Sequence, residues 1–178
     1  DPLDSLREAC GVFGIHNHQP VGNFDHVVAQ ACRDSYLPFL RAMAPHPQFR
    51  FCVHVSGCLW DWMLAHDRTF IDLIGPMVGS GQVELLSGAY QEPIFPILPE
   101  ADLIGQIEAL SGFLRKTFNV EPKGAWLTER VWEPHLPKIP KRAGIDYTLV
   151  YDWHIKGAGI PASELHAPFV TTAAAFTI

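Results

Sequence analysis

The sequence has few charged residues and no long apolar run, and both shortages exclude classes of protein. Only 18% of its 178 residues are charged and 48% are hydrophobic, which is typical of a globular chain and excludes a disordered one. No apolar run approaches the ~20 residues of a membrane-spanning helix. The opening segment, DPLDSLREAC, lacks the basic region and apolar core of a signal peptide. We therefore expect a cytoplasmic protein without a membrane partner.

Clustered basic residues are scarce as well. The net charge is −6, and the small group at Lys138, Lys141 and Arg142 is the only local concentration of basic side chains. Binding to phosphate backbones requires clustered lysine and arginine, so we expect no nucleic-acid partner. The sequence gives no indication of an oligomeric state.

Several motifs that identify other chemistries are also missing. The sequence contains no GxxxxGK[ST], GxGxxG or GxSxG, which excludes a phosphate-binding loop and a nucleophile elbow as starting points. The four cysteines have no CxxC spacing. We interpret Cys10, Cys32, Cys52 and Cys58 as reduced thiols, as expected in a cytoplasm.

Five short apolar segments have the length and composition of buried β-strands. They span residues 11–16, 49–55, 82–87, 124–128 and 146–151. Each is almost entirely apolar, as expected when both faces of a parallel sheet are covered. Helical patterns separate the segments, and this alternation predicts parallel βαβ units in an α/β fold. We expect a single domain over residues 1–178.

Three of the intervening segments have clear helical periodicity. Apolar residues recur with helical spacing over residues 28–43, and Pro38 should kink or split that helix. Residues 59–78 predict one or two helices. Residues 99–118 predict a long helix, because proline and acidic residues stand at its start and an apolar stripe follows.

Polar and aromatic residues follow each predicted strand at its carboxyl end. In parallel α/β folds these ends converge on one face and form the binding site. The sequence therefore predicts one shared polar pocket with aromatic walls. The segments concerned are HNHQP (16–20), HVSG (54–57), SGAYQEP (87–93), TERVWEP (128–134) and YDWH (151–154).

Glu129 is the strongest catalytic candidate, because it follows the fourth strand between two tryptophans. Cleavage of a glycosidic bond needs two carboxyl groups, one of them acting as nucleophile or base. Indoles such as Trp126 and Trp153 suit sugars, whose C–H faces pack on aromatic rings. The structural alternative is a salt bridge between Glu129 and Arg130 or another arginine.

The HNH motif at residues 16–18 has three interpretations. His16 and His18 could bind a metal ion, with His54, Asp152 and His154 completing the ligand set. They could instead hydrogen-bond sugar hydroxyls, or simply be satisfied by backbone groups.

Two further glutamates lie near the predicted pocket. Glu84 lies within the third strand, where we expect it to be buried or at the pocket floor with an arginine, a histidine or a ligand hydroxyl as partner. Glu92 precedes a proline in a loop, and we favour a surface role without function for it.

These motifs together resemble glycoside hydrolase family 57, and in particular its 4-α-glucanotransferase and α-amylase-like members. The resemblance extends from about residue 11 to residue 160, with the motifs in the family's order and at similar spacing. The matching segments are FGIHNHQPVGNF (13–24), VHVSG (53–57), GQVEL (81–85), GAWLTERVWEP (124–134), and AGIDY with YDWH (143–154).

The resemblance implies a retaining enzyme acting on α-1,4-glucans or maltooligosaccharides, built on a (β/α)7-type barrel. Glu129 matches the family's nucleophile. The resemblance also implies that no metal or organic cofactor is needed. The expected sugar-binding residues are His16, His18, Glu84, Trp126 and, by its place in the strand order, Asp152; Trp153 is added for its indole.

The sequence departs from the family's pattern in two places. The family's general acid is an aspartate on a later strand, and this segment is not in the sequence, so we expect an incomplete barrel with little or no turnover. In addition, Pro137 and Pro140 stand where a helix should follow the fourth strand, so that helix should be short or broken.

Three functions therefore remain for comparison with the structure. The first is a glycosidase or transglycosylase that uses Glu129, the second is a metal-dependent hydrolase built on His16 and His18, and the third is a glucan-binding fragment without catalysis. Hydrolysis and transfer differ in whether water or a sugar hydroxyl attacks the intermediate, and these residues do not distinguish them.

Overall fold

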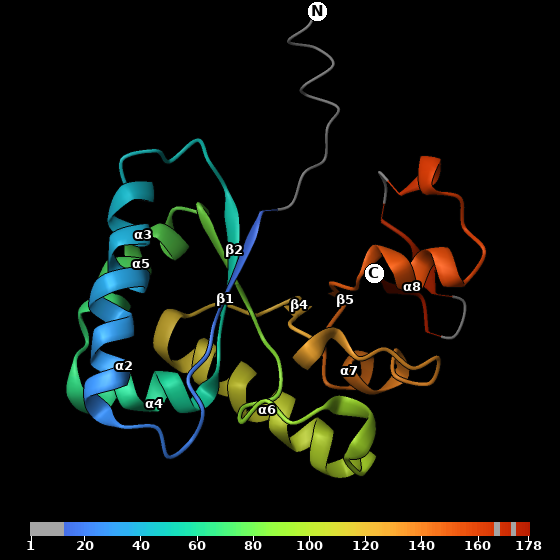
Figure 1. Ribbon diagram of the computed structural model, residues 1–178, viewed down its shortest axis with the longest axis horizontal. Coiled ribbons are helices and arrows are strands. Elements are labelled where there is room, and N and C mark those ends of the chain that lie inside the picture. Colours follow the sequence, from blue (N-terminus) through green and yellow to red (C-terminus); the bar gives the residue numbers. More distant parts are fainter. Residues whose placement is uncertain (1–12, 166–167, 172–173) are drawn as a thin grey trace, which may run out of the picture.

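The structure is a computed structural model that describes residues 13–165, 168–171 and 174–178 (Figure 1). Its first three strands form a parallel sheet in the order β1-β2-β3. They are β1 (Gly14–Asn17), β2 (Phe51–Val55) and β3 (Val83–Leu86). All three were predicted, although residues 11 and 12 of the first predicted strand lie outside the described residues.

A second sheet continues the first. It has the order β4-β5-β7-β6, in which β4, β5 and β7 are parallel and β6 is antiparallel to β7. A parallel bridge between Ser87 and Ala125 joins β3 to β4, so the parallel strands from β1 to β5 follow one another in chain order. The strands are β4 (Gly124–Ala125), β5 (Tyr147–Thr148), β6 (Val170–Thr171) and β7 (Phe176–Thr177).

The fourth and fifth strands are shorter than predicted, for local reasons. After β4 the chain enters a 3-10 turn, η3 (Thr128–Arg130), in which Glu129 and Arg130 have φ of 54° and 48°. Residues in this left-handed region reverse the chain and end a strand. After β5 the predicted strand residue Tyr151 instead precedes a helix, α8 (Asp152–Gly157).

The N-terminal helices agree with their predicted positions. The first helical segment is split as expected from Pro38, into α2 (Asp25–Ala31), a π-helical turn η1 (Cys32–Tyr36) and α3 (Leu37–Met43). Pro38 has no N–H to donate to the preceding turn, which accounts for the wider turn before it. Residues 59–78 fall into two helices, α4 (Gly57–His66) and α5 (Thr69–Gly79).

The later helices also follow the sequence signals. The long helix α6 (Glu100–Phe118) starts after Pro99 and ends at Asn119, whose left-handed φ of 56° is a common C-terminal cap. Two prolines keep α7 (Lys138–Arg142) to five residues, as predicted. Short 3-10 turns complete the chain, η2 (Phe95–Ile97) and η4 (Ala162–Glu164). No helix within the described residues is long and apolar enough to cross a membrane.

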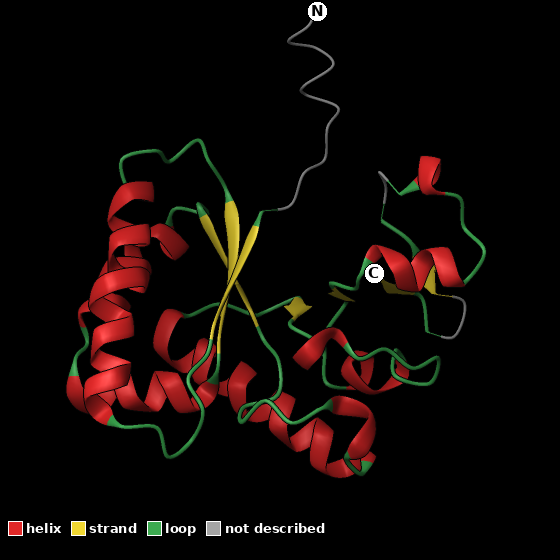
Figure 2. Ribbon diagram, in the orientation of Figure 1, coloured by secondary structure: helices red, strands yellow, loops and turns green. Residues whose placement is uncertain are grey.

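Alternate side chains of β2 point to opposite faces of the sheet. Phe51, Val53 and Val55 of β2 pack in a hydrophobic cluster with helices α2 to α5, which lie together on one side of the strands (Figure 1). Cys52 and His54 therefore point to the opposite face, which is the side of β4 and β5 in Figure 2. A second cluster joins α6, β4, α7 and β7.

Candidate functional site

The carboxyl ends of β1 and β2 place two histidines side by side. His16 and His54 are partners in the parallel register, and their Nδ1 atoms are 2.8 Å apart. His54 is fully buried, whereas the His16 side chain is 26% exposed. His18 follows two residues later on the same face, with its ring nearly parallel to that of His16 and 6.0 Å from it.

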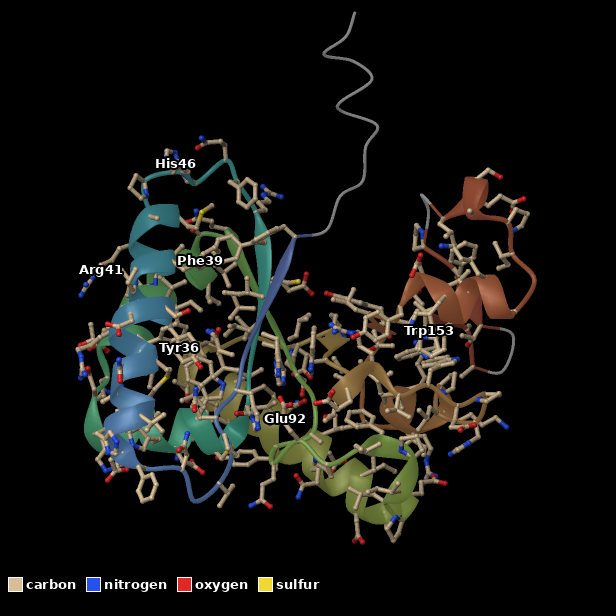
Figure 3. The ribbon with its side chains drawn as sticks, viewed as in Figure 1. Tyr36, Phe39, Arg41, His46, Glu92 and Trp153 are labelled. Carbon is tan, nitrogen blue, oxygen red and sulfur yellow. The ribbon has the colours of Figure 1, made fainter. Side chains whose placement is uncertain are left out.

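Glu92 completes this cluster, and the sequence-based interpretation of it as a surface residue is wrong. Its side chain is only 6% exposed, with Oε1 3.2 Å from Nδ1 of His54 and Oε2 3.5 Å from Nε2 of His16. Its φ of 55° is unusual for a residue other than glycine. Figure 3 shows Glu92 next to the carboxyl ends of β1 and β2.

The loop that carries Glu92 is attached to two helices. The amide of Gly57, at the start of α4, donates to the carbonyl of Tyr90 at 2.7 Å, and a Cβ at Gly57 would lie only 2.2 Å from the Tyr90 ring. The Tyr90 hydroxyl donates to Asp61, and the Gln91 amide donates to Gln106 on α6. The position of Glu92 thus depends on helices far away in the sequence.

Trp126 forms a wall of the cluster. Hydrogen bonds from Ser87 to the Gly124 carbonyl (2.9 Å) and from Trp126 to the Ser87 carbonyl (2.7 Å) align β4 with β3. As a result the indole stacks on His16, with ring centroids 4.4 Å apart and planes inclined by 9°. Its ring centroid is 6.0 Å from that of His54.

Glu129 is exposed at this same end of the sheet. Within the described residues it forms no ion pair, so the structural alternative of a Glu129–Arg130 salt bridge is not supported. The Arg130 guanidinium lies over two aromatic rings instead, 4.9 Å from the centroid of Trp126 and 4.1 Å from that of Tyr151, and it donates to the Tyr151 hydroxyl.

The environment shifts the pKa values of the clustered groups strongly. Burial, helped by the charges of His18 and Arg130, lowers the pKa of His16 to about 4. Burial also holds the pKa of His54 well below its ordinary value. Burial first, and then the nearby charge of Glu129, raise the pKa of Glu92 to about 8. At pH 7 the cluster therefore consists of neutral imidazoles and a largely protonated carboxyl group.

His18 links the cluster to Glu129 electrostatically. Burial lowers the pKa of His18, and the charge of Glu129 opposes that shift. Glu129 therefore lies close enough to influence both His18 and Glu92. A free carboxylate beside neutral hydrogen-bonding groups and an indole is an arrangement that can bind a sugar and attack its anomeric carbon.

Glu84 lies on the same sheet face as His54 but toward the start of the strands. It pairs in register with Cys52, and it is exposed, so the expectation that it is buried is wrong. Its Oε1 accepts a hydrogen bond of 2.7 Å from the Tyr147 hydroxyl of β5, which is not one of the expected partners.

Asp152, Trp153 and His154 lie on helix α8 and not at a strand end. Asp152 is exposed and paired with Lys156, whose hydrogen bond lowers the pKa of Asp152. Trp153 is 59% exposed, and its ring centroid lies 3.7 Å from that of His154 with the two planes tilted by 31°. In Figure 3 Trp153 is well separated from Glu92. The structure brings together His16, His18, Trp126 and Glu129 from the predicted sugar site. They lie with His54, which the sequence suggested only as a possible metal ligand, and the structure adds Glu92.

The metal-ligand set that the sequence offered as one interpretation of the HNH motif does not assemble. Asp152 and His154 are on α8, away from His16. Among the described residues a different group, His16, His54 and Glu92, has ligand atoms within 4.8 Å of one another. The 2.8 Å between the two Nδ1 atoms is a hydrogen-bond distance. Two nitrogens bound tetrahedrally to zinc at ~2.1 Å would be farther apart.

A cavity of about 410 Å³ is lined by none of the cluster residues, although it includes the chain neighbours of His18 and Glu92. Its walls come from the segment after β1, from α4 and from the loop before Glu92. They include Gln19, Asn23, Asp61, Trp62 and Gln91.

Comparisons with known proteins agree with this arrangement. The model of the family described as glycosyl hydrolase family 57 matches residues 12–172. An α-amylase from Pyrococcus horikoshii is 41% identical over 160 residues, which are 90% of this chain and 25% of that protein. A 4-α-glucanotransferase from Thermococcus kodakarensis is 42% identical over 160 residues, 90% of this chain and 24% of that protein.

A solved structure supports the same conclusion. The crystal structure of 4-α-glucanotransferase from Thermococcus litoralis superposes with a TM-score of 0.89 at 38% identity, over 93% of this chain and 27% of that chain. The chain spans about a quarter of the length of the curated relatives that it matches. The match of the family model across most of the sequence, together with these identities, shows that the chain belongs to glycosyl hydrolase family 57.

Proposed function

We propose that this chain is part of the catalytic domain of a retaining enzyme that acts on α-glucans, with Glu129 as the nucleophile. The observation that carries the proposal is the exposed Glu129 carboxylate, whose charge acts on His18 and which has no ion-pair partner in the described part of the chain. A carboxyl group without an ion-pair partner is available to attack an anomeric carbon.

The proposed chemistry proceeds through a covalent intermediate. The Glu129 carboxylate attacks the anomeric carbon, the bond to the leaving oxygen breaks, and a glycosyl ester forms. A general acid protonates the departing oxygen, and water or a sugar hydroxyl then attacks the ester. Water gives hydrolysis, as in the relatives named α-amylase, and a sugar hydroxyl gives transfer, as in those named 4-α-glucanotransferase.

The substrate class follows from the relatives and from the polar groups around Glu129. We propose an α-1,4-glucan or maltooligosaccharide, with His16, His18 and Trp126 contacting the sugar. Glu84, Asp152 and Trp153 remain proposed contacts to other parts of the substrate, although Asp152 is a poor internal substitute for the general acid because Lys156 pairs with it. The chemistry needs no cofactor.

The fold that goes with this function is a (β/α)7-type barrel, of which this chain forms one part as a single domain. Its support is the chain-order succession of parallel strands from β1 to β5, joined across Ser87 and Ala125. A barrel places every strand's carboxyl end on one rim.

A covalent trap tests the nucleophile separately from the general acid. The 178-residue chain is incubated with an α-maltosyl fluoride that carries a second fluorine at C5 of the reacting sugar. Fluoride leaves without protonation, and the C5 fluorine slows breakdown of the ester. We expect a mass increase on Glu129 in the natural chain and none in Glu129→Gln.

Glu133→Gln is the matched control, because Glu133 is an exposed carboxylate in the same segment. It should be labelled like the natural chain. A label on another residue would overturn the assignment of the nucleophile. Binding of maltooligosaccharides without any label would indicate a glucan-binding chain without catalysis.

A further inference from the structure

We propose that Arg130 is a positioning residue, whose guanidinium holds the indole of Trp126 and the ring of Tyr151 in a fixed arrangement beside the proposed sugar site. The inference rests on the proposed function, in which Trp126 contacts the sugar. The two rings come from different segments, because Trp126 follows β4 directly and Tyr151 is the residue before α8. A single side chain that contacts both rings can therefore determine how these segments face the substrate.

The guanidinium makes a cation–π contact with each ring. Its Cζ is 4.1 Å from the ring centroid of Tyr151 and 4.9 Å from that of Trp126. Both distances lie within the ~6 Å over which a cation is attracted to the face of an aromatic ring. Nη2 of Arg130 also donates a hydrogen bond to the Tyr151 hydroxyl, so the phenol is contacted at its face and at its oxygen.

These contacts take the place of the carboxylate that commonly pairs with a partly buried arginine. Within the part of the chain that the structure describes, Arg130 forms no ion pair, and its Nε is buried without a hydrogen-bond partner. A buried N–H without an acceptor is unfavourable. The guanidinium is therefore held in this position by the two ring faces and by the Tyr151 hydroxyl.

The backbone at Arg130 is also unfavourable on its own. Glu129 and Arg130 have φ of 54° and 48°, in the left-handed region that residues other than glycine rarely adopt. The Arg130 amide donates to the Leu127 carbonyl at 2.8 Å and closes the turn after β4. Two strained residues in succession need contacts outside the turn to offset their cost, and the contacts of the Arg130 side chain are of this kind.

The position of Arg130 affects the proposed sugar contacts through Trp126. The imidazole of His16 stacks on this indole from β1, with ring centroids 4.4 Å apart. Arg130 adds the link to Tyr151, and α8, which carries Trp153, begins directly after this residue. The arginine therefore holds the indole and the start of α8 in register with each other.

The experiment removes the guanidinium and, separately, keeps only its charge. Arg130→Met retains a flexible side chain of similar length, and Arg130→Lys retains the cation without the planar group. Arg142→Met is the matched control, because Arg142 is an exposed arginine of the same part of the chain that pairs with Glu100. Each variant is the 178-residue chain, and thermal unfolding shows whether it is folded.

Two measurements are made on each folded chain. NMR of the aromatic ring protons, without sugar, reports the surroundings of Trp126 and Tyr151. Titration with maltotriose gives the affinity for a sugar. A residue that acts on stability alone would lower the unfolding temperature and leave the Trp126 signals and the affinity of the folded chain unchanged.

We expect the ring signals of Trp126 and Tyr151 to shift or broaden in Arg130→Met. Maltotriose should bind about five- to tenfold more weakly to this variant, as for the loss of one or two cation–π contacts. Arg130→Lys should bind with intermediate affinity, because an ammonium group still attracts the ring faces. Arg142→Met should match the natural chain in both measurements.

Tyr151→Leu tests the same contact from its other end. It removes the ring and the hydroxyl that Arg130 contacts, so the Trp126 signals should shift and the affinity should fall as in Arg130→Met. This variant makes the comparison if Arg130→Met does not fold.

Two outcomes overturn the inference. In the first, folded Arg130→Met retains the natural ring signals and the natural affinity. In the second, the affinity falls while the Trp126 and Tyr151 signals stay unchanged, which would mean that Arg130 contacts the sugar itself. Failure of the proposed function looks different, because the ring signals respond to Arg130→Met but the natural chain acquires no label on Glu129.

Discussion

The two parts of the molecule on either side of residue 120 are built very differently. The N-terminal part has strands of four and five residues, a 19-residue helix and a large buried cluster. In the C-terminal part every strand has two residues, and α7 and α8 have five and six.

The two parts supply different residues to the site. The well-packed part supplies His16, His54 and Glu92, which need fixed positions to satisfy one another. The thinly packed part supplies Glu129 and Arg130, from a turn with left-handed backbone. Hydrogen bonds between β4 and Ser87 and the hydrophobic cluster that joins α6 to β4, α7 and β7 bring the two groups together, so the junction between the parts defines the site.

Replacing one tryptophan from each part by alanine tests the comparison most strongly. Trp60 is 1% exposed and packs against Phe113 and Phe118 with ring centroids about 5.5 Å away, whereas Trp153 is 59% exposed. We expect Trp60→Ala to lower the free energy of unfolding by ~3–5 kcal/mol and Trp153→Ala by less than ~1 kcal/mol. Denaturant unfolding measures both values. Equal losses of unfolding free energy would show that the two parts do not differ in packing.

The pH dependence of stability tests the buried site of the N-terminal part. Because the pKa of Glu92 is about 8 in the folded state and near 4.5 when unfolded, its protonation stabilises the fold fully below pH 4.5. This contribution is lost as the pH rises through 8. Glu92→Gln lacks it, so the variant should gain about 4 kcal/mol relative to the natural chain between pH 5 and 8.5.

Urea unfolding at several pH values measures this difference. Glu133→Gln, at an exposed carboxylate, serves as the control and should follow the natural chain throughout. Parallel stability curves for Glu92→Gln and the natural chain would mean that Glu92 titrates normally in the folded state.

Tyr147→Phe tests the junction between the two parts. The Tyr147 hydroxyl donates to Glu84 at 2.7 Å across the boundary between the sheets. Its removal should cost ~1 kcal/mol of stability. A double-mutant cycle with Glu84→Gln isolates the pair, and a coupling free energy near zero would show that this hydrogen bond does not help to join the two parts.

Glu129→Gly should have the smallest effect on stability, and the sign should be favourable. Glu129 has a φ of 54°, which glycine adopts without strain. We expect the variant to be ~0.5–1 kcal/mol more stable than Glu129→Ala, which retains the Cβ, while both lose covalent labelling. A less stable glycine variant would mean that the turn is not strained.

The sequence was sufficient for the parts of the fold that depend on local signals. Apolar runs marked every strand from β1 to β5, and Pro38, Pro99 and Pro140 marked where helices split, began or stayed short. The strand-end rule also brought His16, His18 and Glu129 to one end. These features depend on residues within a few positions of each other, which a sequence displays directly.

What the sequence did not predict depends on contacts between distant segments. Glu92 looked like a surface residue because nothing near it in the chain shows that Gly57 and Gln106 fold its loop over His54. Glu84 was expected to be buried, but its burial depends on which elements cover that sheet face, and its partner Tyr147 is 63 residues away. The ends of β4 and β5 were missed because left-handed residues and helix α8 follow them.

The close approach of Gly57 to the Tyr90 ring has a consequence for motion. Because the backbone of α4 contacts the loop so closely, the helix and the loop cannot slide past each other without breaking a backbone hydrogen bond and separating the ring from the glycine. Any movement of this loop must therefore carry α4 and the Glu92 carboxyl group with it.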